Sequence, residues 1–283
     1  MFTINPFSEL SGFISPLTMQ LYVVVMVLLV VGGTILDMIH KKSAQYFFEN
    51  SKAAQKNATR TVSSGEKASL AVKTVVNEVL TSGEFQNPRR RISHLFIMYG
   101  FILFAATTAI MIFGYTGPGV ITPVILPSLW HLGALMLCFG GYWFWFFIRV
   151  DVAAEGNPWY RVMRADLFIL SLLATATFAL IWSAMQAANV AGWQTLFFGL
   201  FILSSIVLFG GVLWSKFAHM FFKPAAAFQK RVTKADGSAE NLPDLPDLTD
   251  PALQERYPDI PEYMGKNPPN MGPGIKREAP SHF

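Results

Sequence analysis

The residues in this chain that could do redox chemistry are two histidines, each at one end of a long apolar run. His94 lies three residues after the last arginine of Arg89–Arg91, and His219 stands between Lys216 and Lys223. Because basic residues mark the cytoplasmic ends of membrane helices, we expect both imidazoles at the same face and at nearly the same depth. Two imidazoles on two helices are what axial ligation of a b-type haem requires. The spacing therefore predicts one haem b ligated by His94 and His219, with a merely interfacial position for each histidine as the alternative.

Five further residues are candidates for contacting a quinone or a haem propionate, or for hydrogen-bonding a ligating histidine: His40, His131, Arg149, Asp166 and Lys216. His40 lies at the level of the paired histidines, and a simple interfacial position is the preferred interpretation for it. His131 lies near the opposite edge without a partner histidine, so only a quinone contact is expected of it. An ionisable residue within a membrane helix is a functional candidate by default, but Asp166 stands within one turn of the interface. An ion pair of Asp166 with Arg149 or Arg164 is therefore the favoured interpretation.

Composition places the chain among membrane proteins. The 283 residues are 52% hydrophobic and 14% charged, whereas soluble domains carry about 25% charged residues. The net charge of +4 resides in segments that flank apolar runs, so the positive-inside rule explains it and nucleic acid is not an expected partner. The single Cys138 excludes an intramolecular disulfide and a cysteine-ligated zinc or iron–sulfur site built from this chain alone. The first residues lack a basic segment, so we expect no cleaved signal peptide.

The apolar runs predict an all-α membrane protein, a bundle of five transmembrane helices after a short outer segment, residues 1–18. The expected helices cover residues 19–40, 92–115, 129–148, 165–186 and 196–222, within a membrane domain of residues 19–224. Pro224 is expected to end the fifth helix. Charged connections alternate with uncharged ones, which places the N-terminus outside and the C-terminus in the cytoplasm of a bacterial inner membrane.

Two large segments are then cytoplasmic. The loop 41–91 is polar and basic, and its part from Ser64 to Leu80 is expected to be helical, with Ser63 or Ser64 as the cap. The tail 225–283 is rich in proline and is expected to be extended. Its far end mixes aromatic and aliphatic residues with turn residues. A solvated linker and a segment that folds onto a partner protein are both open interpretations of that end.

Three stretches together resemble the NarI-like haem b membrane subunits: RRRISHLFIMYGFILFAATT, RADLFILSLLATATFAL and KFAHMFFKP. The resemblance covers about residues 19–224 and implies the five-helix topology with His94 and His219 as haem ligands. The family's second histidine pair has no counterpart here, so the resemblance implies one haem at most. The basic first loop and the tail motif IPEYMGKNPPNMGPGIKRE are similar to the membrane anchors of dissimilatory adenylylsulfate reductase. That similarity implies a cytoplasmic flavin and iron–sulfur oxidoreductase as the partner of loop 41–91 and tail 225–283.

These observations predict a membrane anchor and electron-transfer subunit that links the soluble enzyme to the quinone pool and breaks no substrate bonds itself. A haem-free structural anchor is the alternative, which the missing second histidine pair favours. A transporter is the least expected function, because the five helices show no inverted repeat and no charge or proline break at their centres.

Overall fold

A computed structural model describes residues 1–40, 42–83, 85, 87–117, 120–151, 156–214, 219–239, 242 and 251–256. In the described part of the chain the regular elements are all helices. Five of them are long and apolar enough to cross a membrane: Pro16–His40, Pro88–Gly114, Ile125–Ile148, Arg164–Ala187 and Ala191–Gly210. The prediction of an all-α chain with five apolar helices is thereby confirmed, and the chain has the character of a multi-pass membrane protein.

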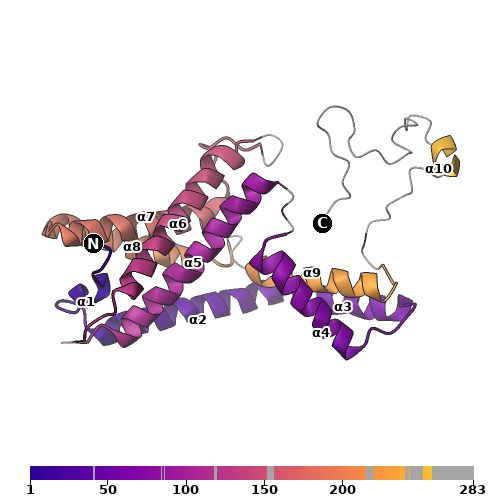
Figure 1. The fold of residues 1–283 in the computed structure, drawn as a ribbon, viewed down its shortest axis with the longest axis horizontal. Coiled ribbons are helices and arrows are strands. Elements are labelled where there is room, and N and C mark those ends of the chain that lie inside the picture. Colours follow the sequence, from indigo (N-terminus) through magenta and orange to yellow (C-terminus); the bar gives the residue numbers. More distant parts are fainter. Residues whose placement is uncertain are drawn as a thin grey trace.

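Two helical hairpins form the centre of the bundle (Figure 1). The first pairs α5 (Pro88–Gly114) with α6 (Ile125–Trp143), which the π-helical turn η2 (Phe144–Ile148) continues. The second pairs α7 (Leu167–Ala187), which follows the short 3-10 turn η3 (Arg164–Asp166), with α8 (Ala191–Gly210). We name the end at which α5 and α7 begin the basic end, and the opposite end the far end.

Glycines let α5 and α6 approach closely. A Cβ atom added at Gly133 would lie 2.7 Å from the backbone nitrogen of Phe104, and one added at Gly100 would lie 2.9 Å from the carbonyl oxygen of Gly133. Small residues at such contacts are what membrane helices use to pack without a hydrophobic driving force between them. The α5–α6 hairpin is therefore the rigid frame that positions the first turns of α5.

The helix α2 (Pro16–His40) packs more loosely beside the two hairpins. Only 11% of its most apolar stretch is buried, against 50% for the span that contains α7. Within the bundle it contacts α8 and α5, and at its end it contacts α3. Most of α2 consequently presents its side chains outward, as expected of a helix that faces lipid.

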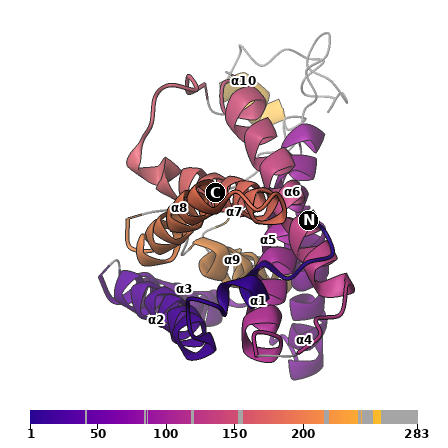
Figure 2. The ribbon, with the colours of Figure 1, turned by 90° about the vertical axis from the view of Figure 1, so that its left-hand side faces the viewer.

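A short helix, α1 (Pro6–Leu10), covers the far end of the bundle, which Figure 2 views. The side chain of Asn5 caps it by accepting a hydrogen bond from the backbone nitrogen of Phe7 at 3.0 Å. The buried ring of Phe7 packs edge-on against the indoles of Trp130 and Trp182. The first residues of the chain are thus part of the bundle's core rather than a free segment.

Three helices form an extension at the basic end: α3 (Ser43–Asn57), α4 (Ser64–Thr74) with the π-turn η1 (Val75–Leu80), and α9 (His219–Ala235). The Nη2 of Arg231 on α9 lies 2.6 Å from a carboxylate oxygen of Glu78. Beyond α9, the carbonyl oxygen of Asp236 accepts hydrogen bonds from the backbone of Thr59 and Arg60. These contacts tie α9 to the segment between α2 and α5. A further short helix is α10 (Pro251–Arg256).

The structure confirms one predicted helix start and corrects a helix end. The side chain of Ser63 caps α4 by accepting a hydrogen bond from the backbone nitrogen of Glu66 at 3.2 Å. The prediction of one helix over residues 196–222 is wrong, because α8 ends at Gly210 and a turn with Gly211 at the helix C-cap follows. The prediction that Pro224 ends a helix is also wrong.

Pro224 lies inside α9, which continues to Ala235. The tail 225–283 therefore begins as a helix, and its residues 240–241, 243–250 and 257–283 lie outside the described residues. In the loop 41–91, α3 is a helix that the sequence pattern did not predict.

Candidate functional site

The first turns of α5 position His94. Asn87 caps this helix by accepting hydrogen bonds from the backbone nitrogens of Arg89 and Arg90, and Pro88 occupies the first helical position. The Nδ1 of His94 lies 2.9 Å from the hydroxyl oxygen of Ser82. A hydrogen bond at Nδ1 fixes the orientation of an imidazole. Histidines that ligate a metal through Nε2 usually make such a bond.

Ser82, the hydrogen-bond partner of His94, has an unusual backbone conformation. Ser82 is fully buried, and its φ of 48° lies in the left-handed region that residues other than glycine rarely adopt. The turn is fixed from α5, since Arg91 donates a hydrogen bond from Nε to the carbonyl oxygen of Thr81 at 2.7 Å. Tyr99 likewise donates from its hydroxyl to the carbonyl oxygen of Leu80 at 2.7 Å. The end of η1 and the start of α5 are therefore one unit.

An aromatic ring links this unit to α9. The centroid of the Phe85 ring lies 4.8 Å from that of the His94 imidazole, and the Nζ of Lys223 lies 5.4 Å from the same ring. Lys223 follows His219 by four residues on α9, which places both residues on one face of that helix. The first turns of α5 and α9 thus lie together around Phe85.

His219 is the first residue of α9, but its side chain lies outside the described residues, as does all of Lys216. The surroundings of His94 fit a haem ligand in one respect, because the hydrogen bond from Nδ1 to Ser82 would orient the ring. The imidazole also contacts the Phe85 ring, whose centroid lies 4.8 Å from its own. The part of the chain that the structure describes contains no cluster of three or more histidine, cysteine or acidic residues.

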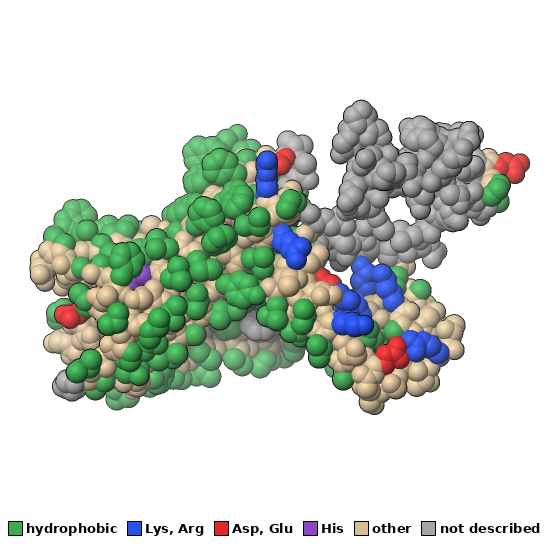
Figure 3. All heavy atoms as spheres, in the orientation of Figure 1, with side chains coloured by type: hydrophobic (Ala, Val, Ile, Leu, Met, Phe, Trp, Pro, Cys, Tyr) green, Lys and Arg blue, Asp and Glu red, His purple; other side chains and the backbone are tan. Residues whose placement is uncertain are grey.

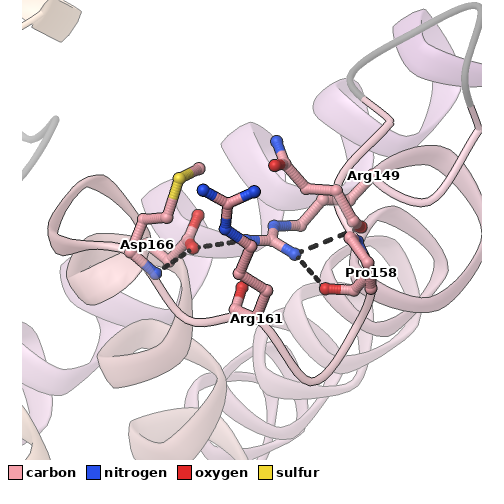
Figure 4. Close-up of polar contacts among 6 residues, drawn as sticks. Arg149, Pro158, Arg161 and Asp166 are labelled. Carbon is pink, nitrogen blue, oxygen red and sulfur yellow. Dashed lines mark hydrogen bonds and ion pairs between the residues drawn. The ribbon is translucent and has the colours of Figure 1, made fainter.

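Arg149 and Asp166 form a buried ion pair between the end of η2 and the start of α7 (Figure 4). The Nη2 of Arg149 lies 2.5 Å from the Oδ2 of Asp166, and the exposed fractions of the two side chains are 0% and 10%. The same carboxylate oxygen accepts a hydrogen bond from the backbone nitrogen of Met163 at 2.8 Å. The predicted ion pair of Asp166 with an arginine is confirmed, with Arg149 as the partner.

The guanidinium of Arg149 also organises the connection between the hairpins. It donates to the carbonyl oxygens of Asn157, Pro158 and Arg161 at 2.6–3.3 Å. Its Cζ lies 4.3 Å from the centroid of the Trp145 ring. Among the described residues the buried Nε has no hydrogen-bond partner. These contacts account for the pair as a structural clasp, and its contact with a quinone or a propionate stays a prediction.

His131 is fully buried near the far end, and the protein occupies both of its ring nitrogens. Its Nδ1 lies 2.7 Å from the carbonyl oxygen of Pro127, which can only accept, so Nδ1 carries a proton. Its Nε2 lies 2.8 Å from the hydroxyl of Ser183, which donates to Nε2 when the imidazole is neutral. A quinone contact at His131 would require these bonds to break. His40, by contrast, is exposed at the end of α2.

Sequence reasoning missed Ser82 and Phe85, which both contact the His94 ring. No spacing rule relates a residue in a turn to a histidine 12 residues later in the next helix. Their role follows only from the fold of η1 onto α5.

Comparisons of the chain with protein-family models, with curated proteins and with solved structures find no match.

Proposed function

We propose that this protein is a membrane anchor and electron-transfer subunit of a redox complex. The extension would dock a soluble cytoplasmic oxidoreductase, for which we propose a flavin and iron–sulfur adenylylsulfate reductase, and the bundle would connect that enzyme to the quinone pool of a bacterial inner membrane. One observation carries the proposal. His94 in the second turn of α5 and Lys223 in the second turn of α9 both lie against the Phe85 ring, so the start of α9 at His219 is close to His94.

The surface of the extension supports a docking role. Large apolar side chains stand exposed on its helices, with Tyr46 and Phe48 on α3 at 64% and 62% and Val72 on α4 at 63% exposure. Where such exposed groups form a contiguous patch, they mark an interaction surface. Figure 3 shows lysine and arginine side chains gathered over the extension and the basic end, while the bundle toward the far end is mostly apolar on this face. The distribution of charge supports the cytoplasmic placement of the extension.

When bound, a haem supplies one-electron chemistry. His94 from α5 and His219 from α9 are the residues that would hold it. Ser82 would keep the His94 ring oriented through Nδ1, and Lys223 beside Phe85 would supply positive charge at the same edge. Arg149 and Asp166 would maintain the packing of the second hairpin against the first.

A haem-free structural anchor is the second candidate, since Ser82 and Phe85 of this chain already hold the His94 ring without a cofactor. In that case the histidine acts only as a packing and hydrogen-bonding residue between η1, α5 and α9. Electron transfer to quinone would then belong to the docked enzyme.

A reduced-minus-oxidised visible spectrum of the purified protein, with extraction of the pigment, separates the two candidates. A b-type signal near one haem per chain is expected, and it should vanish in His94→Ala and in His219→Ala while both variants still insert into the membrane. His40→Ala is the matched control, because this exposed histidine also lies at the basic end. A featureless spectrum from well-folded protein would overturn the haem and leave the structural anchor.

Membranes that contain the protein can test whether the oxidoreductase docks on the extension and the tail. Deleting residues 243–283 should release the oxidoreductase into the soluble fraction if the tail contributes to its attachment. An enzyme that stays with the membrane after the deletion would assign docking to α3, α4 and α9 alone.

A further inference from the structure

A cavity of about 410 Å³ lies inside the bundle between α2 and the two hairpins. This volume is within the range of roughly 300–1,000 Å³ that small-molecule sites occupy. Its α2 wall runs from Tyr22 to Val31, which at 1.5 Å per residue is about 14 Å along the helix. The opposite wall comes from α5, α7 and α8, and Met220 of α9 closes the basic end. Apart from Met220, every lining residue belongs to the apolar spans.

The cavity exists because α2 is attached at two levels. Toward the far end, the hydroxyl of Tyr22 lies 2.8 Å from that of Ser205 on α8. Toward the basic end, Gly33 approaches the residues after α8 so closely that an added Cβ would lie 2.9 Å from the Cβ of Val212. Between these two contacts α2 stands away from α5 and α7.

The lining offers almost no hydrogen-bonding capacity to an occupant. Tyr22 bonds Ser205, whose hydroxyl also lies 2.8 Å from the carbonyl oxygen of Phe201. Thr175 donates to the carbonyl oxygen of Ser171 at 2.7 Å. The fourth hydroxyl, that of Thr108, donates to the Phe104 carbonyl oxygen and accepts from the Trp130 indole. A water molecule needs two to four polar partners, so the lining selects hydrocarbon.

The cavity opens toward the surroundings of α2. Its floor is buried, with Met26 and Phe104 at 7% and Leu208 at 2% exposure, whereas Val27 and Val31 on its α2 wall are 56% and 50% exposed. All of these residues belong to the apolar spans. At this depth of a membrane the surrounding medium is lipid hydrocarbon.

We infer that this cavity is a binding site for one acyl chain of a membrane phospholipid, which enters sideways from the bilayer beside α2. A quinone ring is not the expected occupant, because its carbonyl oxygens would find no available donor among the four lining hydroxyls. The chain fills the space that α2 leaves and supports a helix that has few protein contacts of its own. This inference does not depend on the proposed redox function.

Two adjacent alanines on α5 give a matched test. Ala105 lines the cavity, whereas Ala106 is exposed and does not line it. The full-length protein is reconstituted in vesicles of phosphatidylcholine that carries a photoreactive diazirine in its acyl chain. After illumination, cross-linked peptides are mapped by mass spectrometry. We expect cross-links at Met26 and Phe104, a several-fold loss in Ala105→Leu, and no change in Ala106→Leu.

Cross-links confined to outward residues, or equal labelling of Met26 in both variants, would overturn the site. Ala109→Leu, which fills the same cavity one turn along α5, replaces Ala105→Leu if that variant fails to fold. Lipid extracted from the purified protein identifies the source. If phospholipid co-purifies with the wild-type protein and less of it with Ala105→Leu, the inference is supported. If the molecule that the variant loses is an isoprenoid quinone, the phospholipid assignment is overturned.

Discussion

Removing the carboxylate that faces Arg149 should destabilise the bundle strongly. In Asp166→Ala the guanidinium of Arg149 remains inside the protein with its exposed fraction near 0% but without its counter-ion. Breaking a buried pair by removing one partner costs about 3–5 kcal/mol, because the other charge is left uncompensated. We expect the free energy of unfolding to fall by that amount.

Counting the hydrogen bonds that Asp166→Ala removes gives a similar loss in the free energy of unfolding. The Oδ2 of Asp166 accepts two bonds, from the Nη2 of Arg149 and from the backbone nitrogen of Met163. Hydrogen bonds to charged groups contribute about 1.5–3 kcal/mol each, so two of them give about 3–6 kcal/mol. The remaining bonds from Arg149 to the carbonyl oxygens of Asn157, Pro158 and Arg161 limit the loss. With the carboxylate only 10% exposed, solvent screens the pair little.

Tryptophan fluorescence during denaturation in detergent measures the loss, and Trp145 lies beside Arg149 as a local reporter. Glu66→Ala is the control, since it removes the acid of an exposed pair with Arg60 and should change stability far less. The double variant Arg149→Met/Asp166→Leu should recover part of the loss, because no unpaired charge remains. Asp166→Ala with wild-type stability, or a double variant whose loss equals the sum of the two single losses, would refute the reasoning.

Two further predictions concern packing and charge. Gly133→Ala should lower the free energy of unfolding by about 1–3 kcal/mol, since the new methyl group would meet the backbone of Phe104; Gly199→Ala, where no atom lies within 4 Å, is the control for a denaturation experiment. The hydrogen bond from Arg60 lowers the pKa of Glu66. A lowered folded-state pKa stabilises the protein above the usual value of about 4, and this contribution is lost as the pH falls through the folded-state pKa. A carboxyl-carbon NMR titration should show a low midpoint that returns toward the usual value in Arg60→Met.

Local patterns predicted most of the bundle because each span is a property of its own residues. A run of about 20 apolar residues has few alternatives to a membrane helix, and the observed spans overlap all five expected ranges. The cap at Ser63 was also readable, because a serine three residues before Glu66 satisfies a free backbone nitrogen within one turn. The buried pair of Arg149 and Asp166 followed from the cost of an unpaired charge at that depth.

The break between α8 and α9 was not readable from apolarity. Residues 196–222 are almost uniformly apolar, yet the helix ends at Gly210 and the chain turns at Gly211. The glycine pair was the available signal, since glycine is the usual residue at a helix end, but glycine pairs also serve close packing. Pro224 led to the opposite error: proline usually ends or kinks a helix, but Pro224 lies inside α9, which continues to Ala235.

The polar groups of the bundle differ in where their hydrogen bonds go, and that difference bears on function. His131 and Arg149 are bound by groups at their own end of the bundle, so they hold the helices together. His94 is bound through Ser82, which lies in the turn that joins the extension to α5. Phe85 of that turn also contacts Lys223 on α9. Under the proposed function, a partner that binds the extension therefore binds next to the segment that orients the imidazole. Docking can then change the environment of the proposed haem ligand His94.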